Sequence, residues 1–245
     1  AVTVEGSGAE AGFGGFIPET SGVSVQAIDD PLVERVDIRA NTFSDNRAAA
    51  ARVGDQANMG GALALNNING LKLANNVLAG NGATNGAAIM LFGWNRATIT
   101  ATVADAAVTN NTLFNNEGES GFYIERWTTP LTLTNNIVVS HTVGIVVADN
   151  KVTGGTAVEA RYNLYNANDA DWELDENSSL TETGKITGSV LFVEPWQGNF
   201  GLKPQSAAVD AGDPVGVPPA PAVDIDDTPR PFDQRVDVGA YEWHG

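Results

Sequence analysis

An asparagine-containing corner recurs five times along this chain, each time between two short apolar runs. Asparagine suits such a corner because it tolerates left-handed backbone geometry and its amide can bond to backbone groups of the turn. Apolar residues keep one offset from every corner, which favours a repeated structural unit over a disordered low-complexity segment. A short unit that recurs in this way stacks on its own copies. The aligned corners, spaced by 35, 35, 25 and 27 residues, are Asn41, Asn76, Asn111, Asn136 and Asn163.

A second landmark is a small residue, usually glycine, followed by an apolar strand. It alternates with the corners along the chain, so each repeat is a coil of at least three strands, with insertions in the loops. Stacked coils lie about 4.8 Å apart, so asparagines at one corner can hydrogen-bond along the stack as a ladder. The landmark occurs at residues 14–17, 60–65, 86–91, 121–126 and 144–149.

The charge of the chain excludes two classes of partner. Thirty acidic and thirteen basic residues give a formal net charge of −17, which repels nucleic acid and anionic membrane surfaces. No apolar run approaches the roughly 20 residues of a membrane span, so membrane insertion is not expected. Cysteine is absent, which excludes disulfides and thiolate metal sites.

The corners, the glycine-led strands and the closing segment together carry a family resemblance. The ending reads NFGLKPQSAAVDAGDP, then DIDDTPRP, then DVGAYEW. The chain resembles the right-handed parallel β-helix proteins of the pectate-lyase-like superfamily over residues 14–243. Its ending is similar to the C-terminal coil and cap of secreted bacterial β-helix repeat proteins. The resemblance implies an extracellular or cell-surface protein of bacterial type.

We therefore predict one all-β domain, a right-handed parallel β-helix of about six coils with an asparagine ladder. Its coils occupy residues 1–189, and a last irregular coil with the C-terminal cap occupies residues 190–245. The charged residues 169–188 are interpreted as a loop. Residues 1–5 are predicted to form a strand, so the chain begins inside a coil without a covering helix. An open end of this kind invites strand addition, either by self-association or by an upstream β-helix segment.

The resemblance implies that an enzyme of this fold works on the strand after the glycine landmark. Placing Phe122, Ile124, Ile145 and Val147 inside predicts an outward row that is apolar except for two side chains. A sugar-processing groove needs carboxylates, or a basic residue beside a cation. This row is closer to an interface or to a surface covered by a loop. Its predicted members are Leu63, Leu65, Ile89, Leu91, Tyr123, Glu125, Val146 and Ala148.

If the chain is catalytic, Glu125 with Tyr123 is the candidate acid–base pair. Arg126 and Lys151 lie at the ends of adjacent strands and could neutralise a uronate and abstract a proton, as lyases of the superfamily do. A surface ion-pair cluster is the alternative for these residues. Trp94 and Trp127 each follow a groove strand and could stack on a sugar, or could instead wedge under a loop.

The terminal acids Asp224, Asp226 and Asp210 are candidate oxygen ligands for Ca²⁺, although no cofactor is required. Asp227 stands where the family pattern usually has glycine, which weakens a calcium-loop interpretation. The alternative is that these acids cap turns and bond to arginines.

The function best supported at this point is that of a non-catalytic extracellular surface or structural protein, part of a longer chain or an assembly. The alternative is a carbohydrate-active enzyme (a polysaccharide lyase, epimerase or hydrolase) or a sugar-binding module, each with a polysaccharide partner. Whether the chain is an enzyme is left open.

Overall fold

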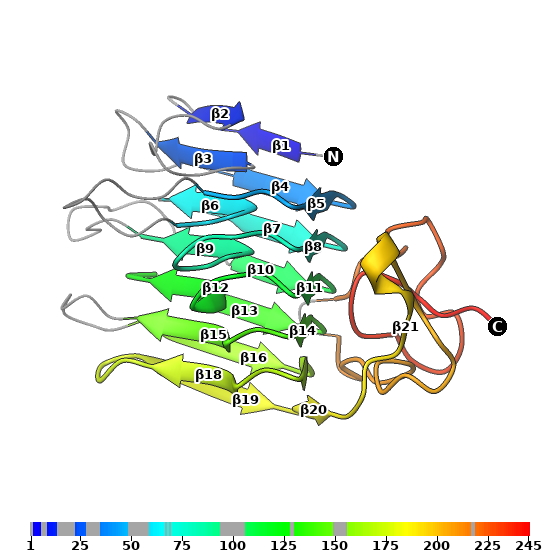
Figure 1. Cartoon of the computed structure of the whole chain (residues 1–245). Coiled ribbons are helices and arrows are strands. Elements are labelled where there is room, and N and C mark those ends of the chain that lie inside the picture. The colour runs from blue at the N-terminus through cyan, green and yellow to red at the C-terminus, as the bar shows by residue number, and fades with distance from the viewer. Residues whose placement is uncertain are drawn as a thin grey trace.

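Short parallel strands stack into six coils along most of the chain (Figure 1). The computed structural model describes residues 2–5, 9–13, 23–27, 35–48, 59–66, 68, 70–93, 106–127, 130–148, 156–216 and 219–245. Each coil contributes one strand to each of three sheets, which run along the stack. This architecture is a parallel β-helix, and it confirms the predicted all-β fold.

The sheets are numbered 1 to 3 here, and each coil passes first through sheet 3, then through sheet 1 and then through sheet 2. Sheet 1 contains β1 (Val2–Glu5), β4 (Arg35–Arg39), β7 (Leu71–Ala74), β10 (Ala106–Thr109), β13 (Leu131–Thr134), β16 (Ala157–Arg161) and β19 (Ser179–Thr183). Sheet 2 contains β5 (Thr42–Ser44), β8 (Val77–Ala79), β11 (Thr112–Phe114), β14 (Ile137–Val139), β17 (Leu164–Asn166) and β20 (Ile186–Thr187). Sheet 3 contains β2 (Ala9–Phe13), β3 (Val23–Ala27), β6 (Leu63–Asn66), β9 (Ile89–Phe92), β12 (Ser120–Glu125), β15 (Val143–Ala148) and β18 (Ala170–Leu174).

The first two strands depart from the parallel pattern. β1 pairs antiparallel with β4, and β2 pairs antiparallel with β3. The predicted N-terminal strand is therefore present, but it runs against its neighbour instead of opening a regular coil. All other pairs in the three sheets are parallel and in register from coil to coil.

The predicted asparagine ladder lies at the corner between sheets 1 and 2. In each coil the residue before the ladder asparagine has a left-handed φ of about 50–56°, as at Asn75, Asn110 and Asn135. The side-chain amide of the ladder asparagine that follows then points along the stack. The Asn111 side chain donates to Asn136 Oδ1 at 3.0 Å and accepts from Asn76 Nδ2 at 2.9 Å. The same contacts join all five predicted residues.

A second ladder occupies the next corner, where each of its residues follows the first-ladder asparagine of the same coil by five positions. Asn46, Asn81 and Asn116 repeat the amide contacts, with side-chain distances of 2.9 Å. In the fourth coil a histidine takes the place of asparagine: His141 Nε2 lies 3.1 Å from Asn116 Nδ2. Asn168 Oδ1 then accepts from the backbone N–H of His141. The sequence interpretation missed this ladder, although the constant spacing of five residues was there to find it.

Replacing Asn111 by alanine is expected to lower the free energy of unfolding by about 3 kcal/mol, because buried partners left without a hydrogen bond cost about 1–3 kcal/mol each. Asn111 is fully buried, and its loss removes the Oδ1 acceptor of the Asn76 N–H and Nδ2 groups and the Nδ2 donor to Leu73 O. Urea unfolding followed by circular dichroism measures the change. Asn41→Ala, at a partly buried rung that water can reach, is the matched control. Equal losses in the two variants would contradict a ladder stabilised by burial.

The outward row predicted for sheet 3 is wrong in two coils. Leu63, Leu65, Ile89 and Leu91 lie in register with Phe122 and Ile124, and all six side chains are at most 1% exposed inside the stack. In β6 and β9 the position aligned with Gly121 is alanine, so counting from glycine shifts the register and exchanges the two faces. The outward residues in that row are instead Ala64, Met90, Tyr123, Val146 and Glu173.

A second apolar core lies outside the stack. Val77, Phe114 and Ile137 point outward from sheet 2, and residues from 192 onward cover them. Phe114 packs edge-on against Phe192 and Phe200, with ring centroids 5.9 and 5.4 Å apart. This C-terminal segment (residues 190–245) includes the antiparallel pair β21 (Phe192–Glu194) and β22 (Asn199–Leu202), joined through a 3-10 turn at Pro195–Gln197.

The C-terminal segment is also hydrogen-bonded to the corner of sheets 1 and 2. Asn75 and Asn110 donate from Nδ2 to the carbonyl oxygens of Val223 and Asp237 at 2.7 and 2.8 Å. Asn135 Oδ1 accepts from the N–H of Asp213 at 2.7 Å. The C-terminal segment therefore runs along the side of the stack and does not cover the end formed by β18, β19 and β20 (Figure 1).

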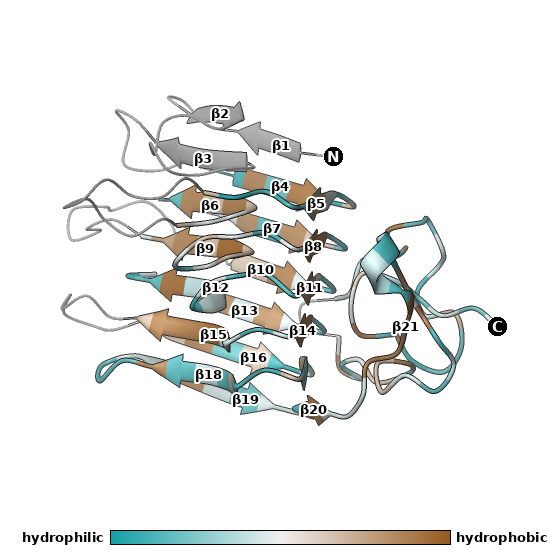
Figure 2. Ribbon diagram, in the orientation of Figure 1, coloured by the Kyte–Doolittle hydropathy of each residue, from teal (hydrophilic) through white to brown (hydrophobic). Residues whose placement is uncertain are grey.

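The charged residues 169–188 are not a loop, as the sequence predicted, but a sixth coil. β18, β19 and β20 continue the three sheets in register with β15, β16 and β17. Figure 2 shows β18 and β19 as mostly hydrophilic, in contrast to the hydrophobic strands of the middle coils. The last coil has one face of the core open to solvent, so its strands have low hydropathy. The apolar pattern that marks the other strands is therefore missing from this part of the sequence.

Candidate functional site

Three of the four predicted catalytic residues come together at the end of β12. Alternation along this strand puts Phe122 and Ile124 in the core and turns Tyr123 and Glu125 outward. Arg126 follows with a left-handed φ of 54°, which folds its side chain back over the sheet. Arg126 Nε lies 3.5 Å from Glu125 Oε1.

The Glu125 carboxylate is held in a tight setting. It is only 5% exposed, and its neighbours in register are Phe92 and Ala148. The Arg126 guanidinium lies 5.4 Å from the centre of the Phe92 ring, a cation–π arrangement. Burial, followed by the charge of Glu125, raises the pKa of the Tyr123 hydroxyl. Tyr123 therefore stays protonated at neutral pH and acts as a hydrogen-bond donor rather than as a base.

The chemistry of this cluster is limited by its carboxylates. Glycoside hydrolysis uses two carboxyl groups that face one bond. In the two adjacent coils, the residues in register with Glu125 are Phe92 and Ala148, and neither is an acid. Lys151 and Trp94 lie outside the described residues, so their predicted roles stay predictions.

Trp127 has a structural position that differs from the one predicted for sugar stacking. Its side chain is 1% exposed and belongs to the inner core with Phe122 and Ile124. A sugar-stacking ring must present a face to solvent, and this indole does not. Trp127 is thus a core side chain, and the alternative that it wedges under a loop stays a prediction.

The predicted calcium ligands lie in the C-terminal segment, where backbone N–H groups hold two of them. Asp224 Oδ1 accepts from the N–H groups of Asp226 and Thr228, both at 2.8 Å, and Asp210 Oδ1 accepts from Arg235 N–H at 2.9 Å. Within the described residues, no group of three or more His, Asp or Glu side chains is arranged to hold a metal ion. Calcium binding at Asp224, Asp226 and Asp210 stays a prediction.

The last coil presents an open face that the sequence did not reveal. Trp172 and Leu174 lie in register with Ile145 and Val147, which are 1% and 0% exposed. Trp172 and Leu174 are nevertheless 39% and 37% exposed. They occupy core positions at the end of the stack, and β18, β19 and β20 are the terminal strands of their sheets among the described residues.

Comparison with known families agrees with this architecture. Residues 18–159, more than half of the chain, match the family described as a right handed beta helix region. The chain therefore belongs to the right-handed β-helix family, and the predicted resemblance to the pectate-lyase-like superfamily is consistent with this. No curated protein and no solved structure matches the chain. No helix in the described part of the chain has the length and apolar character needed to cross a membrane.

Proposed function

We propose that this chain is a non-catalytic, extracellular structural β-helix that assembles end to end through its last coil. One observation carries the proposal: the core positions Trp172 and Leu174 remain more than a third exposed. Burying such side chains contributes about 1.5–3 kcal/mol each. The coil also ends in strand edges that can pair with another chain.

The partner that fits this end is the opposite end of a second copy. There β1 and β2 are the terminal strands of sheets 1 and 3, the same sheets that end in β19 and β18. A head-to-tail contact continues both sheets from one copy into the next. Because the two surfaces differ, such a contact does not close on itself and produces a growing series of species.

Charge makes the assembly dependent on salt. Residues 169–187 carry six acids and one lysine, and residues 1–13 carry Glu5 and Glu10 without a lysine or arginine. Two acidic ends repel each other at low ionic strength. The Debye length falls from about 10 Å at 0.1 M salt to about 3 Å at 1 M, so added salt weakens this repulsion.

Sedimentation velocity across a concentration series, at low and high salt, tests the proposal. The expected result is a concentration-dependent series beyond the dimer, favoured by salt. Leu174→Glu is expected to abolish it, because the change puts a charge into the buried contact. Val215→Glu adds the same charge at a 68% exposed valine of the C-terminal segment and is the matched control.

Three outcomes would contradict the proposal. A monomer under every condition would exclude assembly, and a species that stops at a dimer would exclude the head-to-tail arrangement. Equal effects of the two glutamate variants would exclude the last coil as the contact. Circular dichroism melts of both variants establish that each remains folded. The carbohydrate-active alternative stays a prediction.

A further inference from the structure

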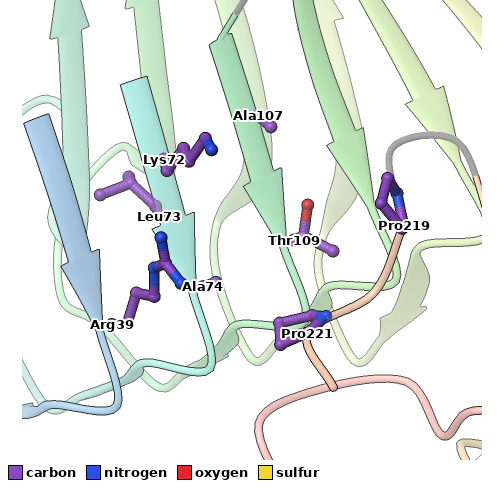
Figure 3. A pocket seen from close by; sticks show the side chains of 8 residues that line it. All are labelled: Arg39, Lys72, Leu73, Ala74, Ala107, Thr109, Pro219 and Pro221. Carbon is purple, nitrogen blue, oxygen red and sulfur yellow. The ribbon is translucent and has the colours of Figure 1, made fainter. Parts of the chain in front are cut away.

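A cavity of about 200 Å³ lies on the outer face of sheet 1, where the C-terminal segment passes over β4, β7 and β10 (Figure 3). It is separate from the β12 cluster, which is on sheet 3, and from the open end of the last coil. The sheet forms its floor, and two prolines of the C-terminal segment form its wall. Its lining residues are Arg39, Lys72, Leu73, Ala74, Ala107, Thr109, Pro219 and Pro221.

The cavity is locally basic on an acidic chain. Arg39 forms a two-bond ion pair with Asp37, whereas Lys72 has no carboxylate within 4.0 Å among the described residues. The two cations of the lining and the carboxylate of Asp37 sum to 2 − 1 = +1, although the whole chain carries −17. An anion is therefore attracted to this face and repelled by most of the remaining surface.

The walls of the cavity indicate the body of the ligand. Pro219 and Pro221 lack an N–H, so they present C–H groups to the cavity. Ala107 keeps the floor shallow, and Thr109 offers a hydroxyl (Figure 3). Pockets for drug-sized ligands hold about 300–1,000 Å³, so this smaller cavity suits one ring. A sugar ring matches both walls, with C–H groups on its face and hydroxyls on its rim.

We propose that this cavity binds a single sugar unit that carries one negative charge. The anionic group lies at Lys72, with Arg39 on the same side, and the ring packs against Pro221. The charge comes from a carboxylate or from a sulfate, since Lys72 provides a point charge that either group satisfies.

Titration of the ¹⁵N-labelled full chain with glucuronate, glucose 6-sulfate and uncharged glucose tests the proposal by NMR. Both anionic sugars, or one of them, are expected to shift the amide signals of β4, β7 and β10, and the preferred sugar identifies the charged group. Glucose is expected to bind at least tenfold more weakly. Raising the salt concentration is expected to weaken the anionic sugars alone.

Two variants separate this site from a general attraction of anions. Lys72→Gln is expected to weaken anionic sugar binding at least tenfold. Lys203→Gln removes an exposed cation of the C-terminal segment, away from the cavity lining, and is expected to leave binding unchanged. Ala107→Leu fills the floor and is expected to remove binding without removing a charge.

The proposal is overturned if neither anionic sugar shifts these signals at concentrations of tens of millimolar. It is also overturned if glucose binds equally well or if Lys72→Gln and Lys203→Gln behave alike. Shifts that survive Ala107→Leu would place the binding elsewhere. The titration is carried out on the full chain carrying Leu174→Glu, which is expected to stay monomeric at every salt concentration, so its result is independent of end-to-end assembly.

Discussion

Replacing Arg230 by methionine is expected to lower the free energy of unfolding by about 3–5 kcal/mol, the cost of leaving a buried charge without its partner. Arg230 Nη1 donates to Glu242 Oε2 at 2.7 Å, and the side chains of both residues are almost completely buried. Arg230 also donates to the carbonyl oxygens of Asp237 and Gly239.

The carboxylate of Glu242 explains why the loss is large. Its oxygens accept from the N–H groups of Phe232 and Asp237, both at 3.0 Å, so the network ties together three parts of the C-terminal segment. Without Arg230, that negative charge stays buried near Asp224 and Asp237. The C-terminal segment is then expected to loosen from sheet 2 and expose the second core, including Phe114.

Urea unfolding measures the loss, and binding of a hydrophobic dye reports the exposed second core. Arg47→Met is the matched control, because it breaks an ion pair with Glu117 in which both side chains are more than half exposed. Little change is expected there, since exposed pairs contribute little. The double variant Arg230→Met/Glu242→Gln is expected to recover part of the stability. Similar losses in the two arginine variants would show that the network is not what holds the segment.

Between pH 6.5 and pH 4 the free energy of unfolding of the wild-type protein is expected to fall by about 3 kcal/mol because of His141. Replacing His141 by asparagine is expected to remove this fall. His141 stands in the second ladder, where every other described rung is asparagine. It is 4% exposed, and burial lowers the pKa of its imidazole from 6.5 to about 4. Each pH unit of such a difference corresponds to about 1.4 kcal/mol.

The direction of the pH dependence follows from proton binding. Between pH 6.5 and pH 4 the unfolded chain binds a proton at His141 and the folded chain does not, so stability falls as the pH falls. The ring geometry gives the reason: Nε2 accepts from Asn116 Nδ2, and a proton on Nε2 would set two donors against each other. The Nδ1 atom is buried without a partner among the described residues.

Urea unfolding of the wild-type chain and of His141→Asn at pH 7.5, 5.5 and 4.0 tests this expectation. Carboxylates titrate in both proteins, so their contribution cancels in the difference between the two. That difference is expected to shift in favour of the variant by about 3 kcal/mol at pH 4. Parallel pH profiles would contradict the assignment of His141 as a neutral rung.

The asparagine pattern was sufficient to predict the fold because the role of each ladder residue depends only on residues next to it in the sequence. An asparagine after a left-handed residue ends one strand and places an amide on the stack, whatever the loops between coils contain. Unequal loops therefore did not disturb the alignment of Asn41 through Asn163. The same logic, applied at a spacing of five, would have predicted the second ladder and the place of His141 in it.

The strand face was harder to predict because the position of Gly121 and Gly144 is occupied by alanine in other coils. A Cβ at Gly144 would lie 2.6 Å from the carbonyl oxygen of Asp171, so glycine is needed there. Ala62 and Ala88 take the equivalent position in earlier coils. Counting from glycine consequently reversed the two faces of β6 and β9.

The sequence by itself thus determined the stack and its first ladder, because these depend on short repeated patterns, whereas the sixth coil was recognised only in the structure. Only the tertiary structure decided which surfaces remain open. The C-terminal segment returns over more than 100 residues of chain to lie against Asn75 and Asn110. That docking creates the cavity at Lys72 and leaves Trp172 uncovered at the end of the stack. Contacts between such distant residues depend on packing in space, which no local pattern records.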